Sequence, residues 1–195
     1  MTAGPWSSRE PSLLPRGSAI FSECGRYRYR LTRQLGIQAP LCTFVMLNPS
    51  TATAEQDDPT IRRCIGFARA MGCGRLVVAN IFAWRATKPA DMRAAADPVG
   101  PENDAHIEQI ARETAETGGK LICAWGTHGA FNDRDRDVMA MLATLPIEPM
   151  SLGETKDSFP RHPLYLPRDC RPLPYRRRER VAKAVEKFQR ENPHG

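Results

Sequence analysis

The chain has 195 residues, of which 41% are hydrophobic and 7% aromatic, and it carries a formal net charge of +6. This length suits one domain with its own core, and no apolar run approaches the roughly 20 residues that cross a bilayer. The six cysteines lack a CxxC motif or a Cys/His spacing, which favours reduced thiols over disulfides or a metal site. We therefore expect a cytoplasmic protein with no metal, no cofactor and no membrane partner.

The first elements are an arm and a hairpin. Residues 1–18 are rich in Pro, Ser and Gly, which predicts a flexible N-terminal arm. Residues 19–31 predict a β-hairpin, because tyrosine or leucine alternates with arginine in its second half. A buried strand is predicted over residues 42–47, an apolar run that stops at the polar turn Asn48-Pro49-Ser50-Thr51.

Strand and helix patterns then alternate along the chain. Asp58 as N-cap and Pro59 at the first helical position predict a helix that ends at Gly72. Further strands are predicted over residues 76–80, 121–125 and 148–152, and further helices over residues 101–118, 133–145 and 178–190. This order predicts a three-layer α/β/α sandwich with a mostly parallel four-stranded core sheet plus the N-terminal hairpin. We expect one domain over residues 19–167, with residues 168–195 forming a basic C-terminal helix that docks on it.

Polar residues follow the predicted strands where ligands usually bind in open α/β sheets, beyond the carboxyl ends. We expect Asn48, Asn80, Gly126 and His162 to line one cleft there. Neither a GxGxxG motif nor a P-loop lysine motif occurs, so a dinucleotide or nucleoside-triphosphate site has little support. Arginines gather near both ends of the chain, interleaved with tyrosines. They indicate either solvated faces or a nucleic-acid surface, and both interpretations remain open.

Several motifs between residues 19 and 167 resemble the domain family DUF1643. They are Tyr27-Arg28-Tyr29, Met46-Leu47-Asn48-Pro49-Ser50-Thr51, Asp57-Asp58-Pro59-Thr60, Arg85-Ala86-Thr87, Asp97-Pro98-Val99-Gly100-Pro101-Glu102-Asn103-Asp104, Ala124-Trp125-Gly126 and Arg161-His162-Pro163-Leu164-Tyr165. That family name implies no function.

The layout is also similar to the uracil-DNA glycosylase superfamily. Asn48-Pro49 matches its motif after the first core strand, Asn80 stands where a base-reading asparagine ends the next strand, and His162-Pro163-Leu164 matches its closing His-Pro-Ser motif. Leu164 departs from the usual serine. No aromatic residue lies between Asn48 and the first helix, so the resemblance leaves the stacking ring to Phe82 or Trp125.

This resemblance implies a DNA glycosylase that recognises a flipped nucleobase, normal or modified, and hydrolyses its N-glycosidic bond. The implied catalytic residues are Asn48, His162 and Asp57. The implied base-binding residues are Asn80, Phe82, Trp125 and Asp58, although Asp58 could serve only as a helix cap. The implied phosphate- or DNA-binding residues are Ser50, Thr51, Arg85, Lys156, Arg161, Arg26, Arg28, Arg176, Arg177 and Arg178. The alternatives are a non-catalytic nucleic-acid-binding module and a hydrolase of free nucleosides or nucleotides.

Overall fold

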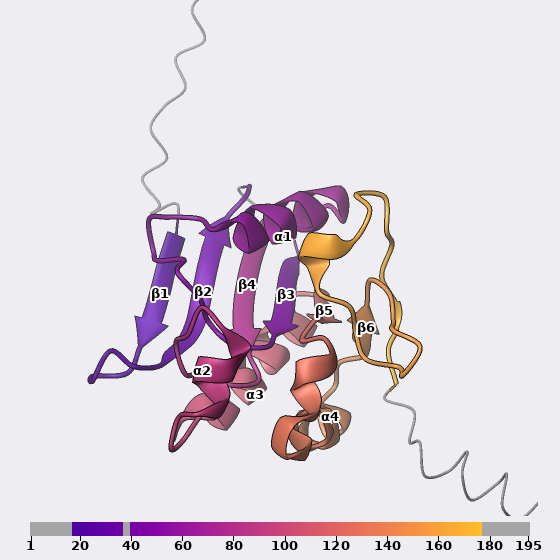
Figure 1. The fold of residues 1–195 in the computed structure, drawn as a ribbon. Coiled ribbons are helices and arrows are strands. Elements are labelled where there is room, and N and C mark those ends of the chain that lie inside the picture. The colour runs from indigo at the N-terminus through magenta and orange to yellow at the C-terminus, as the bar shows by residue number, and fades with distance from the viewer. Residues whose placement is uncertain (1–16, 37–39, 177–195) are drawn as a thin grey trace, which may run out of the picture.

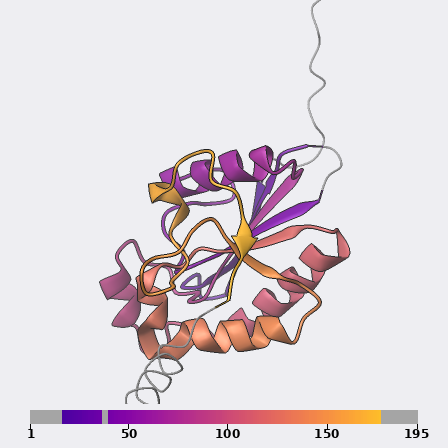
Figure 2. The ribbon, with the colours of Figure 1, turned by 90° about the vertical axis from the view of Figure 1, so that its right-hand side faces the viewer.

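A computed structural model describes residues 17–36 and 40–176, in which a seven-stranded sheet has helices against both faces (Figures 1 and 2). The strand order is β1-β2-β4-β3-β5-β6-β7. The strands are β1 (Gly17–Phe21), β2 (Arg28–Gln34), β3 (Leu41–Met46), β4 (Arg75–Asn80), β5 (Lys120–Cys123), β6 (Pro149–Ser151) and β7 (Leu173–Pro174).

The strand pairings make this a mixed sheet. Strand β3 runs parallel to both β4 and β5, and β6 runs parallel to β5. The pairs β1–β2, β2–β4 and β6–β7 are antiparallel. The predicted α/β class is therefore confirmed, but the sheet is larger than the four predicted strands. The hairpin is part of it, because β2 pairs directly with β4.

Helices divide the core into two layers. On one face lies α1 (Pro59–Ala70), which buries Ile61, Cys64, Phe67 and Ala68. On the other face lie α3 (Asn103–Glu116) and α4 (Arg134–Ala143), which bury Ile107, Ile110, Ala111, Val138 and Leu142. A short α2 (Pro89–Arg93) and the 3₁₀ turns η1 (Thr127–Asp133) and η2 (Pro163–Tyr165) complete the helical segments of the described residues.

Strand alternation decides which residues face α1. On β3, Phe44 and Met46 pack in the α1 layer, whereas Val45 packs in the α3–α4 layer. On β4, Val78 belongs to the α1 layer. Asn80 lies two residues further along, so its side chain emerges on the α1 face at the end of the strand.

Most predicted elements are confirmed to within a few residues, including the cap, since the Asp58 Oδ1 accepts a hydrogen bond from the N–H of Ile61 at 2.8 Å. The helix predicted from residue 101 begins at Asn103. The predicted long loop contains α2, and residues 168–176 contain β7 rather than a helix. Gly17 and Ser18, predicted in the arm, belong to β1. The rest of that arm and the helix predicted over residues 178–190 lie outside the described residues.

Candidate functional site

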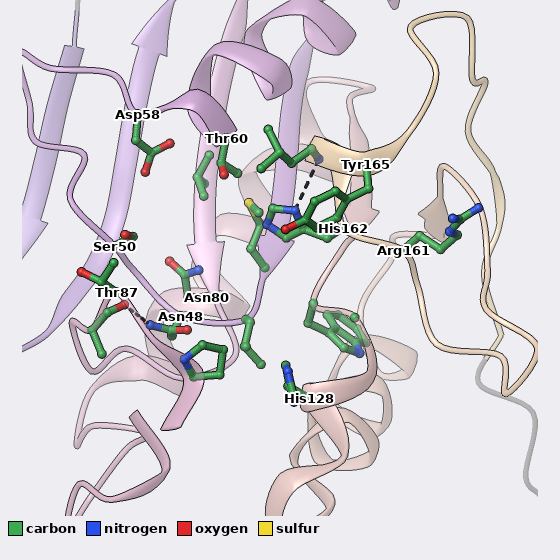
Figure 3. Close-up of a pocket in the computed structure, with 18 of the residues that line it drawn as sticks. Asn48, Ser50, Asp58, Thr60, Asn80, Thr87, His128, Arg161, His162 and Tyr165 are labelled. Atoms are coloured by element: carbon green, nitrogen blue, oxygen red, sulfur yellow. Dashed lines mark hydrogen bonds between the residues drawn. The ribbon is translucent and has the colours of Figure 1, made fainter. Parts of the chain in front are cut away.

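A cavity of about 630 Å³ opens at the carboxyl edge of β3 and β4, beside the N-terminus of α1 (Figure 3). A volume of this size is typical of small-molecule sites. Asn48, Asn80, Gly126 and His162 all line it, as the sequence predicted. The polar turns after β3, β4 and β5 and the loop before η2 therefore meet at one place.

Asn80 contributes a buried amide to the cavity. Its side chain is 2% exposed, and its Oδ1 accepts no hydrogen bond from the described residues. The side chain of Asn103 fixes the backbone at the end of β4, because its Nδ2 donates to the carbonyls of Asn80 and Ile81 at 3.0 and 3.1 Å. A buried acceptor without a partner costs about 1–3 kcal/mol, so this amide is suited to a ligand that donates to it.

His162 lies opposite Asn80 in the cavity (Figure 3). Its Nδ1 accepts a hydrogen bond from the N–H of Leu164 at 3.3 Å, which leaves the proton of the neutral ring on Nε2. Burial lowers the pKa of His162 below its ordinary value, and the charge of Asp58 opposes that shift. The imidazole is therefore neutral at pH 7 and can donate from Nε2.

Asp58 is the one acidic side chain among the described residues that line the cavity. As the N-cap of α1 it accepts a hydrogen bond from the N–H of Ile61 through Oδ1, and within the described residues Oδ2 accepts none. The cap therefore fixes the position of the Asp58 carboxylate, and within the described residues no arginine forms an ion pair with it.

Arg28 reaches the cavity from the start of β2. It is only 3% exposed, and its Nη1 donates to the carbonyl of Ala52 at 2.7 Å. Burial lowers the pKa of Arg28 to about 10, which Asp58 opposes, so the guanidinium remains charged at pH 7. The sequence placed Arg28 on a DNA-binding surface. The structure corrects this placement, since the side chain is inside.

Asn48 joins two loops at the rim. Its Nδ2 donates to the carbonyl of Ala86 at 2.7 Å and to that of Pro49 at 3.1 Å. The N–H of Ala86 in turn donates to the Pro49 carbonyl at 2.9 Å. Part of the role of Asn48 is therefore structural, because it ties the turn after β3 to the loop after β4.

Trp125 supplies the aromatic wall. The ring is 2% exposed, lines the cavity and packs edge-on against Tyr175 with centroids 6.0 Å apart. A methyl group on Gly129 would come within 2.2 Å of the indole, so only glycine fits beneath it. Phe82, the other predicted ring, is fully buried in the α3–α4 layer against Phe131 and does not line the cavity.

Asp57 was predicted to be catalytic, but its carboxylate lies elsewhere. Arg33 Nε donates to Asp57 Oδ1 at 2.7 Å, and Nη2 of the same arginine donates to the carbonyl of Thr53. This ion pair fixes the segment before α1, and Asp57 does not line the cavity. The adjacent carboxylates are separated because Asp58 turns inward to cap the helix.

Some of the predicted phosphate-binding residues line the cavity, and others do not. Ser50 and Arg161 line the cavity, whereas the exposed Thr51 and Lys156 do not. Two other predicted arginines are exposed and lie away from the cavity: Arg26 sits over the ring of Trp84, and Arg85 over that of Phe21. Arg176 lies near β6 and β7, beside another hollow, and Arg177 and Arg178 lie outside the described residues.

Residues to which the sequence assigned no role also line the cavity. They are chiefly hydroxyl and ring side chains in the turns, namely Thr60, Thr87, Thr127, Thr155, His128 and Tyr165. Thr60 and Thr87 stand two residues after Asp58 and Arg85 in the motifs shared with DUF1643. That closeness in sequence to predicted site residues was the signal that could have identified them. His128 Nδ1 lies 3.2 Å from Nη1 of Arg93, a contact across 35 residues that no local pattern predicts.

Within residues 17–36 and 40–176, no group of three or more His, Cys, Asp or Glu side chains is arranged to hold a metal ion. The helices in those ranges are all too short or too polar to span a membrane. Comparison with known families gives a match over residues 28–164 to the family described as "Protein of unknown function (DUF1643)". Neither the curated proteins nor the solved structures contain a significant match to the chain.

Proposed function

Because this chain belongs to the DUF1643 family, whose description assigns no activity, we propose a function from the chemistry of its cavity. The protein binds a nucleobase of a nucleotide flipped out of DNA and hydrolyses the N-glycosidic bond. The observation that supports this proposal is the arrangement of Asn80, His162 and Trp125 around one cavity. Flipping costs a few kcal/mol and exposes the base edge, which a pocket of this kind can read.

The amide of Asn80 and the indole of Trp125 recognise the base. Asn80 offers an acceptor and a donor at one point, the combination that complements a base edge. The Trp125 ring lines the cavity, where a planar base can pack against it. Since the amide has no partner for Oδ1 in the described chain, a base donor there would satisfy a group that is otherwise left unbonded.

His162 assists the departure of the base. Cleavage places both electrons of the C1′–N bond on the leaving base. A neutral His162 donates from Nε2 to the atom where that negative charge develops, which stabilises the transition state electrostatically. The hydrogen bond from Leu164 holds the ring in the tautomer that this role needs.

Asp58 replaces Asp57 as the carboxylate that activates water. The oxygen of water attacks C1′ while the bond to the base breaks, and Asp58 accepts the proton that water loses. No hydrogen bond from the described part of the chain reaches its Oδ2, so this oxygen is available for the step, whereas the carboxylate of Asp57 is paired with Arg33.

A free nucleotide is the second candidate substrate. The observation that favours it is that three arginines of β2 are withdrawn from the surface: Arg28 is buried, Arg30 pairs with Glu113, and Arg33 pairs with Asp57. Fewer surface cations then remain to bind a phosphate backbone.

A substrate panel tests the proposal. Duplex and single-stranded DNA carrying normal or modified bases would be incubated with the full chain, and abasic sites cleaved with alkali. We expect strand cleavage with at least one base. Neutralising Arg26 and Arg176 together should flatten the salt dependence of DNA binding. Release of base from free nucleotides alone, with DNA untouched, would move the activity to the second candidate. No release from any substrate would contradict both.

A further inference from the structure

Among the described residues that line the cavity, Arg28 and Arg161 carry charges that the base chemistry does not use, and of these two only Arg28 is buried. Its guanidinium has a hydrogen bond through Nη1 to Ala52, while Nε is buried without a partner among the described residues. Within those residues no carboxylate oxygen lies within 4.0 Å of a guanidinium nitrogen of Arg28. A buried guanidinium has five N–H donors and is costly to leave without a counter-charge.

The two other arginines of β2 each pair with a carboxylate, unlike Arg28. Arg30 makes two hydrogen bonds to Glu113, at 3.0 and 2.7 Å, and Arg33 pairs with Asp57 at 2.7 Å. Carboxylates of α3 and of the segment before α1 thus pair with the two other arginines of β2, whereas Arg28 faces the cavity. A counter-ion for Arg28 can therefore enter from outside the chain.

Burial of the Arg28 cation favours an anion there. Desolvation lowers the pKa of Arg28, and the positive charges of Arg85 and Arg33 lower it further. Asp58 is the opposing charge, and its Oδ1 is already held by the N–H of Ile61. The net effect still disfavours the cation, so an arriving anion would be stabilised.

The distance between Arg28 and Trp125 across the sheet indicates which kind of anion Arg28 binds. Strand β2 stands three places from β5 in the order β2-β4-β3-β5, and Trp125 follows β5. Three strand spacings amount to roughly 14 Å, so the cavity can hold a base at the Trp125 end and a further group at the Arg28 end. Asn80 on β4 lies between them, and Ser50 adds a hydroxyl to the wall.

We propose that Arg28 forms a phosphate subsite for the nucleotide whose base fills the cavity. This inference rests on the proposed function and narrows it: the substrate is recognised as a nucleotide, not as a nucleoside or a free base. Arginine suits this role because its planar fork can donate two parallel hydrogen bonds to phosphate oxygens.

Calorimetric titration of the full chain tests the subsite without requiring turnover. The probes are inorganic phosphate, deoxynucleosides, their 5′-monophosphates and a short oligonucleotide. We expect a monophosphate or the oligonucleotide to bind roughly 10- to 100-fold more tightly than the nucleoside, and Arg28→Met to abolish that difference. The matched control is Arg69→Met, an exposed arginine in the last turn of α1 that does not line the cavity, which should leave the difference intact.

The arms separate the possible outcomes. Dependence on Arg28 with monophosphates assigns the subsite to a free nucleotide, and dependence with the oligonucleotide alone assigns it to a DNA phosphodiester; both support the inference. Equal binding of nucleoside and monophosphate, unchanged in Arg28→Met, would overturn the subsite and leave the base site standing. Phosphate binding that depends on Arg28 without any base preference would keep the subsite and overturn the proposed function. If Arg28→Met does not fold, Arg28→Lys tests the same point, since it keeps the charge and loses the fork.

Discussion

Two buried asparagines, Asn80 at the end of β4 and Asn103 at the start of α3, use their side chains differently. Asn103 donates to two backbone carbonyls and so holds the strand end in position. Asn80 is equally buried, and within the described residues Oδ1 of both asparagines accepts no hydrogen bond, but of the two only Asn80 lines the cavity. The first amide stabilises the fold, whereas the second is available to a ligand.

Replacing each asparagine by leucine should separate these roles. Asn80→Leu removes a group without a partner, so the free energy of unfolding should change by less than about 1 kcal/mol while nucleobase or nucleotide binding is lost. Asn103→Leu breaks two hydrogen bonds and should cost about 1–3 kcal/mol. Urea unfolding and calorimetric titration measure the two effects. A large loss of stability in Asn80→Leu would argue that this amide is structural.

His162 should link stability to pH. Its pKa is depressed in the folded state, so the unfolded chain binds the proton more readily between the depressed value and the ordinary value of about 6.5. The contribution of His162 is therefore complete above about pH 6.5 and is lost as the pH falls through its folded pKa. Protonation would also remove the acceptor that Leu164 uses.

The difference in unfolding free energy between the native chain and His162→Asn measures this linkage. It should be about 1 kcal/mol at neutral pH and shrink in acid. Comparing the two proteins cancels the contribution of His106, whose pKa burial also lowers. A difference that stays constant with pH would show that His162 does not titrate as described.

At the scale of elements, the start of α1 combines a structural and a chemical duty in Asp58. Asparagine caps helices as well as aspartate does, so Asp58→Asn should keep stability within about 0.5 kcal/mol while lowering base release by roughly 10²-fold or more. Asp58→Ala should lose the cap as well, at a cost of about 1 kcal/mol.

Asp57→Asn is the matched control for this substitution. It breaks the ion pair with Arg33 and should lower stability, with turnover unchanged below the melting temperature. Thermal unfolding and base-release assays on both variants show which of the two carboxylates is needed for turnover. If Asp57→Asn loses turnover and Asp58→Asn does not, the roles assigned here are reversed.

Periodicity and capping predict the regular elements well, because those signals are local. The cap at Asp58 and the apolar face of α1 follow from spacing alone. Strand β7 has two residues and α2 has five, too few for a periodic pattern to emerge. The mixed pairing of the sheet depends on which edge accepts β2, a contact between distant residues that no local pattern encodes.

Over the whole molecule, the carboxyl-edge rule brings Asn48, Asn80 and His162 together correctly. It does not decide which of two adjacent carboxylates turns inward or which arginines are buried. Asp57 and Arg28 were misplaced because their positions depend on partners far away in sequence, Arg33 and Ala52 respectively. The net charge of +6 likewise overstates the basic surface, since the charge of Arg28 lies inside.

The central claim is hydrolysis of an N-glycosidic bond with His162 assisting the leaving base. Single-turnover reactions in ¹⁸O-labelled water, with DNA and mononucleotide substrates analysed by mass spectrometry, measure it most directly. The account predicts free base and a sugar labelled at C1′, formed roughly 10²- to 10³-fold more slowly by His162→Ala while substrate affinity changes little. Absence of free base from every substrate, or equal rates for the two proteins, would contradict it.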